Sequence, residues 1–152
     1  MRGTAASALV VAFLSLGVSG FALVRSFDRE PDYTDEQRAT ATSKICTAFD
    51  TVRTGVATNT NTTPPGGADD ITGALAVAAN ARLALSDGGL YLLARLEPAT
   101  PDDLATAVRS FADALLDVGA AATAGVPNTD PEQTRRLAAA EQAAAAVSDR
   151  CR

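Results

Sequence analysis

Apolar residues recur at helical spacing in several stretches between residue 34 and the C-terminus. In the clearest stretch, apolar side chains alternate steps of four and three residues, the heptad spacing that packs a helix against its neighbours. The residues of this seam are Leu104, Val108, Phe111, Leu115, Val118 and Ala122. An earlier stretch places Ile45, Phe49, Val52 and Val56 on one face. Both patterns predict amphipathic helices.

Polar residues mark the limits of the first two predicted helices. A capping box opens the first helix at Thr34. Residues 59–68 contain turn-forming residues without periodicity and are expected to form a loop. Asp69 or Asp70 then caps a second helix over residues 71–96.

The second predicted helix is apolar nearly all round, which is typical of a helix in the middle of a bundle. Gly88 and Gly89 interrupt its pattern. We expect a kink there, with a C-cap followed by a separate short helix as the alternative.

The last two helices share a start signal in which proline follows a capping residue. Thr100 is the expected N-cap before Pro101, and Asp130 is the expected N-cap before Pro131. Gly125 closes the third helix. Four helices with mostly short connections predict an all-α domain, an up-down-up-down four-helix bundle.

The N-terminal part has a different composition. Residues 5–24 carry no charge, and a helix of this length spans about 30 Å, the thickness of a bilayer's hydrocarbon core. We therefore expect a transmembrane anchor at residues 5–24, preceded by a short cytoplasmic tail at residues 1–4. A juxtamembrane stalk at residues 25–44 and an extracytoplasmic helical bundle at residues 45–152 are expected to follow.

A cleaved signal peptide is the alternative to this anchor. Gly20 and Ala22 place small residues where a signal peptidase would require them, so cleavage near Ala22 would release a secreted protein. The apolar run is longer than the usual hydrophobic region of a signal peptide, which favours a retained anchor. The expected location is the cell membrane, single-pass, with the C-terminal domain outside the cytoplasm.

Composition excludes several classes of function. The 152 residues include 33 alanines and no histidine, and the net charge is −5. Without histidine, the usual Ser-His-Asp and Cys-His nucleophile systems and histidine-ligated metal sites are excluded. An acidic chain without a basic run is a poor nucleic-acid binder. We expect no enzyme activity, no cofactor, no metal site and no nucleic-acid partner.

The two cysteines are Cys46 and Cys151, and both lie on apolar helical faces. In an up-and-down bundle of four helices, the start of the first and the end of the fourth lie at the same end. Cys46 can reach Cys151 if the first turns of its helix project toward the membrane as part of the stalk. We therefore predict a disulfide, with two buried free thiols as the alternative.

Arg82 is the other candidate site residue, because it falls near the centre of the helical face defined by Ile71, Leu75 and Leu85. A buried arginine can anchor an anionic ligand, but an internal ion pair is the expected arrangement. The candidate partners are Asp113, Asp117 and Glu141. Asp50, Asp113 and Asp117 are otherwise expected to be solvated carboxylates.

Four features of the sequence resemble those of a known group of proteins. They are the short N-terminal anchor, the Lys44–Phe49 segment (KICTAF), the Pro64–Gly67 loop (PPGG) and the C-terminal cysteine. The chain resembles uncharacterised, alanine-rich, single-pass exported proteins of mycobacteria and related actinobacteria. This resemblance implies a location in the cell envelope and provides no active site.

Two functions fit these expectations. The first is a non-enzymatic accessory module that binds another envelope protein. The alternative is an extracytoplasmic bundle that binds a small ligand or lipid, in a cavity that the interruption at Gly88 leaves open. An enzyme is the third possibility and would require a pocket with a carboxylate of raised pKa.

Overall fold

A computed structural model describes residues 32–67 and 69–152 of this chain. Within that part, the regular structure is entirely helical, with four α-helices and no strand. The helices are α2 (Asp35–Thr60), α3 (Ile71–Arg95), α4 (Asp102–Thr123) and α5 (Pro131–Arg150). The all-α class is confirmed, and the helix limits differ from those predicted by only a residue or two.

The expected anchor at residues 5–24 lies outside the described residues, as do the cytoplasmic tail and the possible cleavage site near Ala22. Among the helices that the structure describes, none combines the length and apolar character needed to cross a membrane.

Three of the predicted helix starts are confirmed. The Thr34 side chain accepts a hydrogen bond from the Gln37 N–H at 3.2 Å, and the Gln37 side chain accepts one from the Thr34 N–H at 2.9 Å. Asp70 caps α3 by accepting from the Gly73 N–H at 2.8 Å. Asp130 caps α5 through two backbone N–H groups of its first turn. These bonds satisfy donors that a helix start leaves without intrahelical partners.

The predicted cap at Thr100 is wrong. The N–H of Thr100 donates to the Glu97 carbonyl at 3.0 Å, which closes a turn before α4. The Thr100 side chain is buried at 4% exposure, and its hydroxyl has no hydrogen-bond partner among the described residues. The N-cap position falls on Pro101, which supplies no side-chain cap. Two aspartates in the first turn of α4 still complement the positive end of its dipole.

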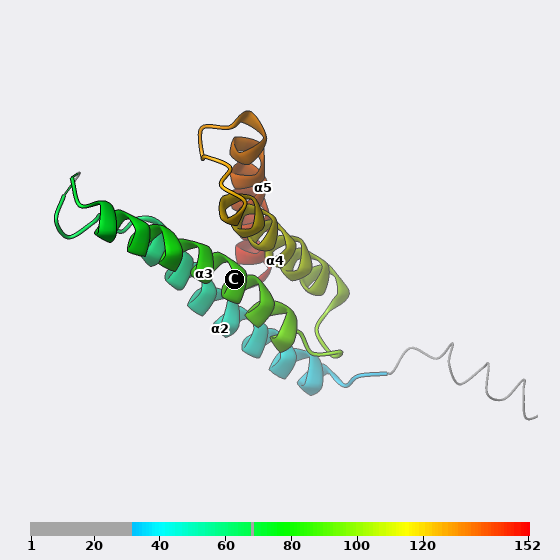
Figure 1. Ribbon diagram of the computed structural model, residues 1–152. Coiled ribbons are helices and arrows are strands. Elements are labelled where there is room, and N and C mark those ends of the chain that lie inside the picture. Colours follow the sequence, from blue (N-terminus) through cyan, green and yellow to red (C-terminus); the bar gives the residue numbers. More distant parts are fainter. Residues whose placement is uncertain (1–31, 68) are drawn as a thin grey trace, which may run out of the picture. The chain divides into compact units, whose positions relative to one another are not determined.

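Successive helices pack side by side in antiparallel directions (Figure 1). Lys44 in the first half of α2 pairs with Glu97 just after α3 at 2.8 Å. Arg150 at the end of α5 pairs with Asp103 at the start of α4 at 3.3 Å. By contrast, α2 and α5 contact each other far less than the three consecutive pairs do. The bundle therefore consists of two helical hairpins joined through α3 and α4, with one side left open.

The disulfide between Cys46 and Cys151 connects the two helices that barely touch. The two Cα atoms are 5.6 Å apart, and the bond joins positions separated by 105 residues. The pairing predicted from the sequence is confirmed. Residues 35–40 at the start of α2 are all exposed, and Ala41 is the first buried position of the compact unit Thr34–Arg152.

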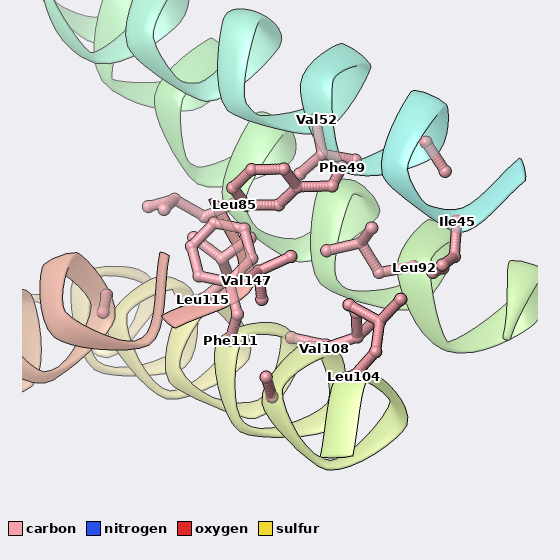
Figure 2. Packing of buried hydrophobic residues seen from close by; sticks show 14 of the residues in the cluster. Ile45, Phe49, Val52, Leu85, Leu92, Leu104, Val108, Phe111, Leu115 and Val147 are labelled. Atoms are coloured by element: carbon pink, nitrogen blue, oxygen red, sulfur yellow. The ribbon is translucent and has the colours of Figure 1, made fainter. Parts of the chain in front are cut away.

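Side chains from all four helices meet in one core (Figure 2). Phe49 of α2 and Phe111 of α4 pack edge to face, with ring centroids 5.4 Å apart. Leu92 of α3 and Val147 of α5 are fully buried in the same cluster. The predicted seam of α4 is buried from Leu104 to Val118. The periodicity of α4 therefore identified the side of that helix on which the others pack.

The expected central position of α3 is wrong in one respect. This helix packs between α2 and α4, but its remaining side is open to solvent. Its apolar residues Ile71, Leu75, Leu83 and Leu90 are 75%, 66%, 57% and 56% exposed. Two neighbouring helices cover only part of a helix surface, so an all-round apolar pattern leaves an uncovered apolar face.

Gly88 and Gly89 lie within α3, which is continuous through them. The alternative of a C-cap and a separate short helix is therefore wrong. A Cβ on Gly88 would lie 2.8 Å from a methyl group of Val52 in α2, and one on Gly89 would lie 2.8 Å from the Ala112 carbonyl oxygen in α4. The two glycines thus allow α3 to approach both of its neighbours closely.

Candidate functional site

A cleft of about 610 Å³ lies between the two hairpins and is lined by residues of all four helices. Its α2 wall uses positions after Cys46, and its α5 wall uses positions before Cys151. The cleft therefore lies on one side of the disulfide. Its main apolar lining residues are Val56, Leu85, Phe111, Leu115, Val118 and Leu137. A volume of this size falls in the usual range for small-molecule sites.

Small side chains on facing helices explain why this space stays open. Ala78 and Ala81 line it from α3, and Ala140 and Ala144 line it from α5. A methyl group is too short to bridge α3 and α5, which make almost no direct contact, so the gap between the hairpins stays unfilled at these positions. Gly88 and Gly89 do not line this cleft, and Gly88 instead lines a second, more open hollow of about 570 Å³ between α2 and α3.

Arg82 lines the cleft, and the expected ion pair with an acidic residue is absent. No salt bridge joins it to Asp113, Asp117 or Glu141 in the described part of the chain. Instead, the half-buried Arg82 donates from Nε to the Ala122 carbonyl oxygen at 3.0 Å. That carbonyl lies in the last turn of α4, at the negative end of the helix dipole. One edge of the guanidinium is thereby fixed by the backbone, and no carboxylate among the described residues forms an ion pair with it.

Arg53 and Glu141 are the other charged residues of the cleft lining. Both are exposed, and neither forms an ion pair or a side-chain hydrogen bond with any other described residue. The cleft lining therefore carries two arginines and one carboxylate. Sequence reasoning missed Arg53, although its position one residue after Val52 and three before Val56 places it at the border of the apolar face of α2.

The candidate carboxylates Asp50, Asp113 and Asp117 are exposed and do not line the cleft. Across residues 32–67 and 69–152, no three acidic or cysteine side chains lie close enough together to hold a metal ion. The arrangement that remains combines buried apolar walls with guanidinium groups that are nearer to solvent and form no ion pair with any described residue. Such a site can hold a molecule that is mostly apolar and has a polar end.

Comparison with protein-family models, curated proteins and solved structures finds no match for this chain.

Proposed function

We propose that this protein is a non-enzymatic binding module of the cell envelope that holds a small, largely apolar molecule in the cleft between its two hairpins. The observation that carries this proposal is the cleft itself, which has a ligand-sized volume and apolar walls from four helices. A fully packed core would leave no space for a ligand and would count against this proposal. A chain without histidine also lacks the most common general base for catalysis at neutral pH.

The proposed location is outside the cytoplasm, with residues 5–24 as a single membrane anchor. The disulfide supports this location, since such bonds persist in oxidising compartments. The uncharged run of residues 5–24 supports the anchor. A binding module held at the membrane surface would meet apolar molecules where they are most concentrated.

Photo-crosslinking of the full-length protein in its own membranes tests the function. A photoreactive long-chain alkyl probe is expected to label peptides that line the cleft, such as those containing Leu85 and Leu115. Ala81→Phe places a large ring in the cleft and should abolish this labelling. Ala79→Phe is the matched control, because Ala79 lies two positions away on the exposed face of α3. Absence of labelling at the cleft by any alkyl probe would refute the proposal.

The exposed apolar residues of α3 favour a second candidate, an accessory module that binds another envelope protein. Leu83 and Leu90 lie at heptad spacing on the uncovered face of this helix. If a partner helix packs there, Leu83→Gln and Leu90→Gln should remove a crosslinked complex that forms in membranes. Ala81→Phe in the cleft should leave that complex intact, which separates the two candidate functions.

A further inference from the structure

We propose that the ligand of the cleft is a single-chain amphiphile with an anionic head, of the fatty-acid type, and that Arg82 and Arg53 bind its head group. This inference rests on the proposed function and specifies the chemistry of the ligand. The apolar part of the ligand would lie against Phe111 and Leu115, and the anionic part would face the two guanidinium groups.

The first support is the contrast in burial between the apolar and the cationic residues of the cleft lining. Phe111, Leu115 and Val118 on α4 are almost completely buried and form its deep wall. Arg82 is half-buried and Arg53 is exposed, so the cationic groups lie nearer to solvent. An acyl chain gains free energy on the deep wall, while a charged head keeps its hydration near the arginines.

The second support is the charge left without a partner. Arg82 and Arg53 have no ion pair within the described residues, and both line the same cleft. Glu141 supplies one negative charge, so the lining keeps one excess positive charge. The Arg82 side chain is already fixed by its bond to the Ala122 carbonyl, which leaves its terminal N–H groups for an oxyanion.

The third support concerns the shape of the occupant. A peptide helix is about 10–12 Å wide and needs a groove that is open along its length. The cleft stops short of the disulfide: its lining reaches Arg53 on α2 and Ala144 on α5, and one turn further on lie Phe49 and Val147, which are almost fully buried in the core. A single acyl chain can enter a pocket with one closed end, which favours a small amphiphile over a protein segment.

The test compares two photoreactive probes of equal chain length, a fatty acid and its fatty alcohol, on the full-length protein in membranes. The acid is expected to label cleft peptides about tenfold more than the alcohol. The alcohol cannot form the charge-assisted hydrogen bond to an arginine, and the loss of such a bond lowers affinity by about this factor. Equal labelling by the two probes would overturn the anionic-head proposal while leaving the proposed binding function intact. Absence of labelling by both would remove the function itself.

Charge variants sharpen this test. Arg82→Gln and Arg53→Gln should each lower labelling by the acid severalfold, and Glu141→Gln should raise it by removing the one repulsive charge. Arg109→Gln is the matched control, because Arg109 is an exposed arginine of α4 outside the cleft lining. Arg53 makes no hydrogen bond through its side chain in the described part, so its variant stays informative if Arg82→Gln disturbs folding. Unchanged labelling in the Arg53 variant and in a folded Arg82 variant would contradict the assignment.

A third probe distinguishes the source of the anionic head. A photoreactive two-chain anionic phospholipid presents similar charge on a bulkier body. Labelling of the cleft by the fatty acid in preference to the phospholipid is expected for a pocket of about 610 Å³ with a closed end. Labelling by the phospholipid alone would overturn the single-chain assignment.

Discussion

At the residue scale, the glycine pair of α3 shows how much helical preference the chain gives up for close packing. Glycine in a helix interior is less favourable than alanine by about 1 kcal/mol. Gly89 nevertheless lies where α3 meets α4, and a Cβ there would lie 2.8 Å both from the Ala112 carbonyl oxygen and from the Leu116 side chain. A backbone oxygen in a packed helix cannot move away cheaply, so only glycine fits at this position.

We expect Gly89→Ala to lower the free energy of unfolding by about 2 kcal/mol, because overpacking outweighs the gain in helix preference. Gly55→Ala in α2 provides the matched control, since a Cβ at Gly55 would have no heavy atom within 4 Å. That variant should raise the free energy of unfolding by about 0.5–1 kcal/mol. Urea denaturation followed by circular dichroism measures both changes. A neutral or stabilising Gly89→Ala would show that α3 and α4 are further apart than described.

The residues that sequence reasoning placed correctly are those whose role is local. The capping box at Thr34 and the cap at Asp130 depend only on the next few backbone N–H groups. Thr100 carries the same local signal, yet its side chain is buried and its hydroxyl has no hydrogen-bond partner among the described residues. Its environment depends on the turn to Glu97 and on the packing of distant elements, which a short sequence window does not contain.

At the element scale, the apolar faces of the helices were only partly predictable. The seam of α4 was identified because its apolar residues form one stripe with polar residues opposite. In α3, apolar residues surround the helix, so the pattern gave no information on which side would be covered. The exposure of Leu83 and Leu90 follows from the number of neighbouring helices, which local periodicity does not encode.

The disulfide is the main link between α5 and α2, because α5 otherwise packs chiefly on α4. The ion pair between Arg150 and Asp103 is largely exposed and contributes little. A crosslink across 105 residues restricts the unfolded chain strongly, with an upper expectation of about 4–5 kcal/mol.

We therefore expect reduction, or the double substitution Cys46→Ala and Cys151→Ala, to lower the urea midpoint of unfolding substantially. Hydrogen exchange should show the greatest loss of protection in α5, while the amides of α4 near Phe111 remain the slowest to exchange. The oxidised wild-type protein in the same buffer is the control. Equal loss of protection in α2, α3 and α5 would mean that the bond supports the whole bundle rather than its last helix.

At the scale of the whole molecule, the candidate site arises from the placement of one hairpin against the other. Gly88 and Gly89 allow α2 and α4 to approach α3 closely near the middle of the bundle, and the disulfide joins α2 to α5 at one end. The alanine-lined space next to this close approach stays open. The sequence identified Arg82 as a candidate site residue but assigned it an internal ion pair, whereas its Nε donates to a backbone carbonyl. The error arose because the distance from α3 to the acidic side chains of α4 and α5 depends on this long-range placement.

The disulfide and the expected anchor make a joint prediction about where the protein is found. If residues 5–24 remain as a membrane anchor and the helical domain faces an oxidising compartment, the protein from its native membranes should have its full-length mass. Neither cysteine should react with an alkylating reagent before reduction, and both should react afterwards, since the described residues contain no free cysteine. Intact-mass spectrometry with and without reduction measures both properties in one sample.

The possible outcomes separate the two properties. A mass that begins near Leu23 with a protected cysteine pair would retain the oxidising compartment but make the protein secreted, so that the cleft would collect its ligand away from the membrane. A full-length mass with freely reactive cysteines would place the domain in a reducing compartment. The bond that ties α2 to α5 would then be absent in the cell, and the closed end of the cleft, on which the single-chain assignment depends, would lose its covalent support.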